Sequence, residues 1–362
     1  MTNEIESPGS ALWEVLSRLD RDLRQSSSLL TPTEARFLCD FYYQIQRDRI
    51  RSNNQVSKTE EEHEPNRVLT WFADSTRKLE DDIKRALDSY SNRPRVGLWM
   101  KSIVGIGPVL SAGFLSHLDI RTTGDTPCHW WRLAGLDPTF IWYGKDAATK
   151  LVTNVAGKTK GTLSTEQMEQ LVQLTNRPLK TFERVCEGTY TVPRLITYLS
   201  KLPWNKTLKT LCFKLGDCFV KFQNHKNDFY GKIYVERKAY ESNKNEHLEY
   251  KEQAEQSLAK YNYGKDTEAR KWYEQGKLSP GHIHMRCLRY TVKLFLSHFH
   301  HVCWKDFHDV EPAKPYPFST NEQGKRRVSG DHRHFLPPPN YPFTEEVKTG
   351  ISLKEFYPTP HE

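Results

Sequence analysis

Apolar residues in the first half of the chain recur mostly with the three-and-four spacing of amphipathic helices. The first such run starts at Thr31 and Glu34, which flank a proline and have the spacing of a capping box. Its apolar stripe is Leu38, Phe41, Tyr42 and Ile45, and the basic residues Arg47, Arg49 and Arg51 end the run. A polar, acidic linker is expected over residues 52–64.

A second long helix is predicted to start near Pro65. Its stripe is Leu69, Phe72, Leu79, Ile83 and Leu87. Two long helices joined by a short linker predict a helical hairpin over residues 1–95. These helices could pack on the rest of the chain, or they could pair with a second copy as the coiled-coil arm of a homodimer.

The sequence of residues 96–138 predicts a compact unit of two helices joined by a tight hairpin. Gly105 and Gly107 are expected to supply positive φ angles and close packing at the hairpin. Pro108 suits the first position of the second helix. Ile103, Ile106, Leu110 and Phe114 are expected to pack the two helices together.

The rest of the chain divides by composition. Residues 139–203 are rich in Thr and Gly and hold one short helix candidate at 164–174, so they are interpreted as an inserted subdomain. Helical spacing returns at 205–222, 228–240, 241–261 and 281–304, which makes 204–308 a basic helical domain. Residues 309–362 form a proline-rich tail, expected to be extended on the surface or disordered. The predicted fold class is mainly α.

Composition favours an intracellular protein with an anionic partner. The formal charge is +8 over 362 residues, and the isoelectric point is about 8.9, which fits a polyanion without requiring one. The seven dispersed cysteines form no CxxC pair, so reduced thiols are expected. No signal peptide and no apolar stretch of membrane-spanning length is visible. The expected location is cytoplasmic, or nucleoid-associated in a bacterium.

The hairpin has an electrostatic consequence. Backbone N–H groups at such a turn and at the start of the following helix can bind a DNA phosphate, which positions a duplex without reading its sequence. The candidate contacts are Lys101, Gly105, Ile106 and Gly107. A purely structural hairpin is the alternative. A dinucleotide site is not supported, because no strand precedes the glycines and no GxGxxG is completed.

A basic stretch provides further candidate contacts. Residues 194–238 contain ten basic side chains and three acidic ones. Lys206 and Lys209 share a helix face, with Trp204 nearby, and Lys214 follows on the same predicted helix. Such a face can follow phosphates while an aromatic ring packs on a sugar or base. A solvated basic face with Trp204 in the core is the alternative.

Several motifs, in order along the chain, resemble a known family. Residues 103–108 (IVGIGP) and 130–138 (WWRLAGLDP) are followed by 204–211 (WNKTLKTL), 228–231 (DFYG) and 283–295 (IHMRCLRYTVKLF). This order is similar to the C-terminal, helix-hairpin-helix half of insertion-sequence transposases that pair a RuvC-like nuclease half with a serine-bearing helical half. The resemblance covers roughly residues 65–305 and implies a DNA-binding protein related to a mobile-element transposase.

Departures from that family weaken any catalytic expectation. Residues 1–95 are helical and too short for the nuclease half, whose spaced acidic residues hold divalent metal. The segment expected to carry the serine is replaced by residues 139–203, and Ser200 with Lys201 lacks the surrounding Ser/Gly run. The catalytic residues are therefore unknown, and no cofactor or metal site is predicted. His284 and Cys287 share a helix face, but no acidic residues accompany them at ligand spacing.

Duplex DNA binding without catalysis is therefore the main expectation. Two alternatives remain open: a diverged serine recombinase or transposase, and a structured-RNA-binding or scaffold protein of a phage or mobile element.

Overall fold

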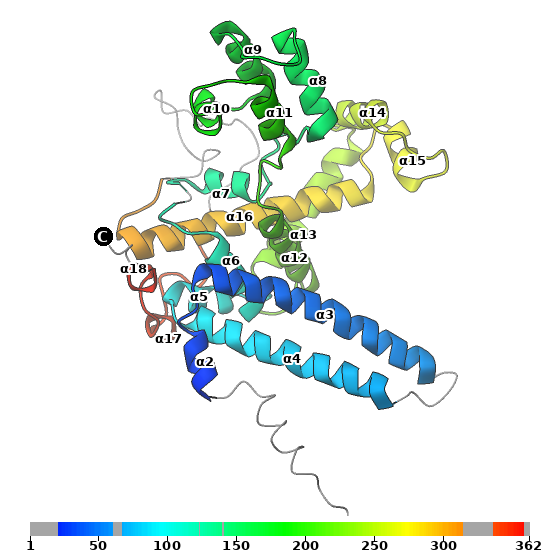
Figure 1. Cartoon of the computed structure of the whole chain (residues 1–362). Coiled ribbons are helices and arrows are strands. Elements are labelled where there is room, and N and C mark those ends of the chain that lie inside the picture. Colours follow the sequence, from blue (N-terminus) through cyan, green and yellow to red (C-terminus); the bar gives the residue numbers. More distant parts are fainter. Residues whose placement is uncertain (1–20, 61–66, 123, 140, 314–335, 358–362) are drawn as a thin grey trace, which may run out of the picture.

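The chain is built almost entirely from helices. The computed structural model describes residues 21–60, 67–122, 124–139, 141–313 and 336–357, which form 17 helices and no strands (Figure 1). The mainly α prediction is therefore confirmed. The predicted helix start at Pro65 and prolines 315, 317, 358 and 360 of the tail lie outside the described residues.

Two long antiparallel helices form one edge of the molecule. Helix α2 (Arg21–Ser27) is short, and α3 (Pro32–Glu60) and α4 (Arg67–Asn92) lie side by side (Figure 1). The predicted capping box is present, since the Thr31 amide donates to Glu34 Oε2 at 2.7 Å and the Glu34 amide donates to Thr31 Oγ1 at 3.3 Å. The expected linker from residue 52 is wrong up to residue 60. Residues 52–60 contain no Gly or Pro, so nothing interrupts the helix.

The predicted hairpin region packs against this pair of helices. Helix α5 (Arg95–Lys101) is followed by α6 (Pro108–His117) and α7 (Pro127–Leu133), and α6 contacts both α3 and α4. Pro108 occupies the first turn of α6, as predicted. The four residues expected to join the two helices are buried: Ile103, Ile106, Leu110 and Phe114. The N-terminal helices therefore share one apolar core with the hairpin.

Residues 144–200 form a lobe with its own core. The sequence predicted one helix there, and the structure has four: α8 (Gly144–Ala156), α9 (Thr165–Thr175), α10 (Leu179–Cys186) and α11 (Val192–Ser200) (Figure 1). The predicted helix is α9, which begins with a capping box between Ser164 and Gln167. Helices α10 and α11 are short, and glycine or proline lies between successive helices of the lobe, so their periodicity is hard to see. Val152, Leu171, Phe182 and Leu195 are at the centre of this lobe.

The basic region forms the remaining long helices. These are α12 (Lys206–Lys221), α13 (Tyr230–Glu246), α14 (Lys251–Lys260), α15 (Glu268–Glu274) and α16 (Pro280–His308). The charged segment expected as one helix at 241–261 is divided by a turn in which Leu248 has φ +58°. Helix α16 contacts α5, α7, α12, α13 and α18, so it connects most of the molecule.

The end of the tail is part of the core. Helices α17 (Glu345–Lys348) and α18 (Leu353–Phe356) pack beside α5 and the end of α16, and Leu353, Phe356 and Tyr357 are buried. The Trp99 indole N–H donates to the Pro339 carbonyl at 2.8 Å. The expectation of an extended or disordered tail is therefore wrong for residues 336–357, because their apolar side chains complete the main core.

The cysteines and the apolar character of the helices were also subjects of the sequence predictions. All seven cysteines are free thiols. None of the described helices combines the length and the apolar character that crossing a bilayer requires.

Candidate nucleic-acid interface

The hairpin between α5 and α6 uses its two glycines differently. Gly105 has φ +93°, as expected for a position that favours glycine. Gly107 has φ −97° and ψ −179°, which is extended backbone, so the prediction of a positive φ there is wrong. The reason is that Gly107 is the N-cap of α6, and N-cap residues adopt the extended conformation. A Cβ at Gly105 would lie 3.5 Å from Phe222, which shows that the hairpin packs on the end of α12.

Two of the four hairpin candidates have structural roles. The Ile106 side chain is buried in the main core and is not available to a ligand. The Lys101 ammonium donates to Asp88 Oδ1 at 2.6 Å and also to Asn92, both on α4. Lys101 therefore joins α5 to α4, and its charge is already paired.

Gly105 and Gly107 line a pocket of about 320 Å³ at the N-terminus of α6. We call this the hairpin pocket, and its lining comes from α3, α4, the hairpin and α12: Tyr42, Tyr43, Gln46, Lys84, Gly105, Gly107, Pro108, Val109, Leu110, Lys214, Asp217, Cys218 and Lys221. The first amides of a helix have no acceptor inside it, and Gly107 supplies no side-chain cap. Backbone donors and lysines therefore converge on one opening.

The charge of the hairpin pocket is positive. Lys214 lies with its ammonium 3.9 Å from the centre of the Tyr43 ring, and burial lowers its pKa, with smaller contributions from Arg47 and Lys221. Asp217 is the one carboxylate in the lining, and it pairs with Lys221 at 2.7 Å. Lys84 is exposed and has no acidic partner within 4 Å among the described residues. Two lysine charges are therefore left for an anion.

The other two predicted lysines lie at the opposite end of α12. Lys206 and Lys209 are exposed, and neither lines the hairpin pocket. The Lys209 ammonium is 4.1 Å from the centre of the Trp204 ring. Trp204 itself is half-buried over Gly135, where a Cβ would come within 2.7 Å of the indole. The lysine and the aromatic ring are therefore adjacent, as predicted, but they form a separate part of the surface.

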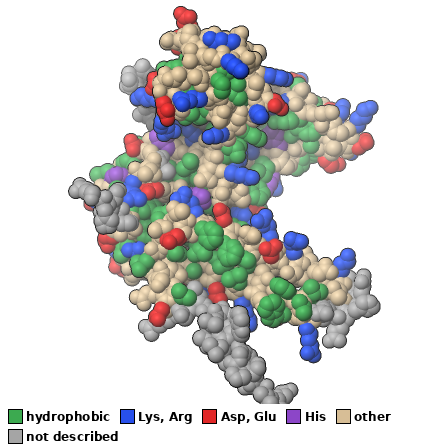
Figure 2. Space-filling view, viewed as in Figure 1, with side chains coloured by type: hydrophobic (Ala, Val, Ile, Leu, Met, Phe, Trp, Pro, Cys, Tyr) green, Lys and Arg blue, Asp and Glu red, His purple; other side chains and the backbone are tan. Residues whose placement is uncertain are grey.

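Basic side chains are also spread beyond the pocket. Figure 2 shows a hollow between the α3–α4 hairpin and the arm formed by α14 and α15, with Lys and Arg side chains along its edges. Helix α12 lies between these parts of the molecule (Figure 1). Its exposed residues include Lys206, Lys209 and Phe213, the last of which is 49% exposed. Basic and aromatic side chains of α12 therefore lie beside this hollow.

Four further residues of the hairpin pocket were not predicted from any motif: Tyr42, Tyr43, Gln46 and Lys84. Tyr42 belongs to the apolar stripe of α3, and Lys84 was one of several charges on α4. They line the hairpin pocket because α3 and α4 pack across α6. These helices are far from Lys214 in the sequence, so local spacing does not bring their side chains together with it. The one available signal was the tyrosine pair, since aromatic hydroxyls on an otherwise apolar stripe often mark a polar boundary.

Two other candidate groups have ordinary structural partners. The His284 ring accepts or donates a hydrogen bond with the Tyr234 hydroxyl at 2.6 Å, and Cys287 is buried. The Ser200 hydroxyl donates to the Ile196 carbonyl at 2.6 Å within α11. Within the described ranges, no three His, Cys, Asp or Glu side chains lie close enough together to hold a metal ion.

Comparison of the chain with known protein families, curated sequences and solved structures found no match. The resemblance to the transposase half therefore rests on the order of short motifs and on the helical hairpin alone.

Proposed function

We propose that this chain binds nucleic acid, duplex DNA in the first place, through contacts to the phosphate backbone. In this interpretation α5 and α6 are a helix-hairpin-helix unit that receives one phosphate, and α12 extends the contact along the strand. The supporting observation is that Gly105, Gly107 and Lys214, three of the sequence-predicted contacts, line one positively charged pocket.

The chemistry of the hairpin pocket suits an oxyanion such as a backbone phosphate. Open amides at the first turn of α6 can donate to several oxygens at once, and the helix dipole favours negative charge there. Lys84 and Lys214 add point charges from two other elements. Contacts of this kind do not read bases, so the expected binding depends little on sequence. No catalytic step is part of the proposal, and the expectation of a protein without its own nuclease or recombinase chemistry stays a prediction.

Gly107 offers a sharp test because it is the N-cap of α6. An aspartate at an N-cap stabilises a helix by a few tenths of a kcal/mol relative to glycine, and nothing lies within 4 Å of a Cβ at this position. Gly107→Asp should therefore fold at least as well as the parent. Its carboxylate, however, stands where a phosphate would bind, so we expect duplex affinity to fall at least tenfold, measured by fluorescence anisotropy with a labelled duplex.

Gly107→Asn is the matched control, because asparagine caps a helix equally well and has nearly the same shape without the charge. We expect its duplex affinity to fall much less than that of Gly107→Asp. Equal affinities for the two folded variants would remove the hairpin pocket as a phosphate site. The same titration with a structured RNA separates the RNA-binding alternative, which predicts tighter binding to RNA than to duplex DNA.

Salt dependence tests the contribution of α12. Binding through phosphates weakens with ionic strength, with a log–log slope of about 0.9 per phosphate neutralised on duplex DNA. Lys206→Ala should reduce that slope by roughly one and weaken different sequences alike. Lys58, a surface lysine near the far end of α3, gives a control with the same change of charge. A parent protein whose binding does not respond to salt would point to a protein partner.

A further inference from the structure

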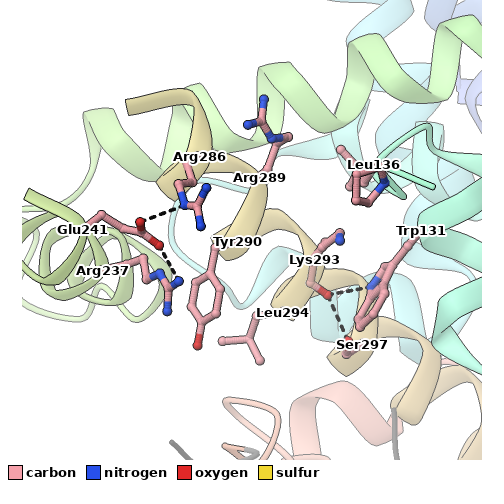
Figure 3. A pocket seen from close by; sticks show the side chains of 11 residues that line it. Trp131, Leu136, Arg237, Glu241, Arg286, Arg289, Tyr290, Lys293, Leu294 and Ser297 are labelled. Atoms are coloured by element: carbon pink, nitrogen blue, oxygen red, sulfur yellow. Dashed lines mark hydrogen bonds and ion pairs between the residues drawn. The ribbon is translucent and has the colours of Figure 1, made fainter. Parts of the chain in front are cut away.

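A second pocket lies on the first half of α16, apart from the hairpin pocket (Figure 3). We call it the α16 pocket, and its volume is about 360 Å³. Helices α7, α13 and α16 and the segment after α7 supply its lining: Trp131, Leu136, Pro138, Arg237, Glu241, Arg286, Arg289, Tyr290, Lys293, Leu294 and Ser297. Its volume is at the lower end of the range for small-molecule sites.

The lining contains four cations and one carboxylate, and the carboxylate is already occupied. Glu241 is fully buried and pairs with Arg237 and with Arg286, the latter at 2.7 Å. The Tyr250 hydroxyl also donates to it. Burial would raise the pKa of Glu241, but these partners outweigh it and hold that pKa below its usual value. This carboxylate therefore cannot neutralise the remaining cations of the pocket.

Arg289 and Lys293 are those remaining cations. Neither has an acidic partner within 4 Å among the described residues. Asp137 lies near Lys293, but it pairs with Arg132 at 3.5 Å and accepts hydrogen bonds from Thr139. Burial lowers the pKa of Lys293, as does Arg289, while Asp137 and Cys128 act in the opposite direction. The repulsion between like charges held close together is relieved by a bound anion.

The walls beside these cations are flat and apolar. The Lys293 ammonium is 5.0 Å from the centre of the Trp131 ring, and the Trp131 indole N–H donates to the Lys293 carbonyl at 3.0 Å, which fixes the ring (Figure 3). Tyr290 lies on the other side, with the Arg237 guanidinium 4.4 Å from its ring centre. Leu136, Pro138 and Leu294 complete the apolar lining. An aromatic ring can stack on such walls while its phosphate reaches the cations.

We propose that the α16 pocket binds a phosphorylated nucleotide, with the base against Trp131 and the phosphate at Arg289 and Lys293. This inference stands independently of the hairpin pocket, since the two share no lining residue. A free nucleotide and the phosphorylated end of a strand present the same chemistry. Helix α12 packs on α16, so a strand bound along α12 could deliver its end to the pocket.

The test is titration of the full chain with AMP, with adenosine and with inorganic phosphate by calorimetry. AMP should bind at least tenfold more tightly than either fragment, because both the walls and the cations contribute. Arg289→Gln and Lys293→Met should each weaken AMP at least tenfold; methionine keeps the apolar stem beside Trp131. Lys58→Met removes the same charge from an exposed position on α3 outside both pockets and should leave AMP binding unchanged.

Three outcomes would overturn the inference. These are no detectable AMP binding at millimolar concentration, equal affinity for AMP and inorganic phosphate, and equal weakening by Lys58→Met and Lys293→Met. A 5′-phosphorylated oligonucleotide and its 5′-hydroxyl counterpart then identify the source: tighter binding of the phosphorylated strand than of AMP assigns the pocket to a strand end, and the reverse assigns it to a free nucleotide. Gly107→Asp should bind AMP like the parent, so failure of one pocket leaves the other testable.

Discussion

The two halves of α16 place polar side chains in opposite environments. In the first half Arg286, Arg289 and Lys293 follow one face at helical spacing and open onto the α16 pocket. In the second half His298 and His300 are buried among aromatic rings. The His298 ring bonds to the Tyr230 hydroxyl at 2.8 Å and to the Leu336 carbonyl at 2.7 Å. One continuous helix thus contains both an accessible cationic face and a closed polar core.

What covers the helix accounts for this difference. Helices α5 and α7 and residues 336–357 pack over the second half, so its imidazoles lose water and stay neutral. Burial lowers the pKa of His298 to about 3 and that of His300 to about 4. The first half also packs on α12 and α13, with Leu288 and Val292 buried, but its Arg289 side chain is exposed and keeps access to solvent. The buried imidazoles of the second half therefore belong to the core, and the cations of the first half are the groups that can bind an anion.

The largest effect on stability should come from replacing Glu241, the buried carboxylate beside the first half of α16. Glu241→Gln leaves Arg237 and Arg286 without their shared counter-charge, and breaking a buried ion pair in this way costs about 3 kcal/mol. We expect the free energy of unfolding in urea to fall by about that amount.

Glu236→Gln, an exposed position on the same helix, is the control and should change stability by less than about 0.5 kcal/mol. Equal stability of the two variants would mean that Arg286 needs no counter-charge. In that case Arg286 would join Arg289 and Lys293 among the free cations of the α16 pocket.

The pH dependence of stability tests whether His298, in the second half of α16, is buried in its neutral form. In the folded chain the pKa of His298 is about 3, below the unfolded value of about 6.5. The unfolded state therefore binds the proton first, and stability is lost as the pH falls from 6.5 towards 3. One such histidine lowers the free energy of unfolding by about 1 kcal/mol between pH 6.5 and 5.5.

His298→Gln keeps a hydrogen-bonding side chain but does not titrate. The variant should therefore lose about 1 kcal/mol less than the parent over the same pH interval, in urea unfolding at both pH values. His117 and His300 also have lowered pKa values, each about 4, so the variant should keep part of the acid sensitivity. An unchanged pH dependence would show that His298 is not buried as a neutral group.

Local signals explain which elements could be predicted from the sequence. The capping box at Thr31, the helix that starts after Ser164 and the proline at the start of α6 depend only on neighbouring residues, and the structure contains all three. The tail could not be read in this way. Its prolines indicated an extended segment, yet Leu353 and Phe356 are buried because the core of α5, α6 and α16 has a gap that only distant residues fill.

The residues of the candidate site also differ in whether local sequence signals or long-range packing determine their role. Gly105, Gly107 and Lys214 were predicted and do share a pocket, because the hairpin packs on α12. Lys101 was predicted from its place near the hairpin, but its partner Asp88 lies on α4 and could not be seen from spacing. The α16 pocket was missed altogether. In the sequence, a basic helix face is all that is visible in Arg286, Arg289 and Lys293. The pocket exists because Trp131 and α13 pack against this face.

The smallest effect on stability is expected at Arg289 in the first half of α16, where a bound anion is proposed. Arg289 is exposed and has no acidic partner within 4 Å among the described residues, so Arg289→Gln removes no buried contact and should change the free energy of unfolding by less than about 0.5 kcal/mol. It also relieves repulsion of Lys293 and Lys209, whose pKa values Arg289 lowers, so a slight gain in stability fits equally well. A loss above 1 kcal/mol in urea unfolding would instead give Arg289 a structural role like that of Glu241. The first half of α16 would then stabilise the fold in the same way as the second.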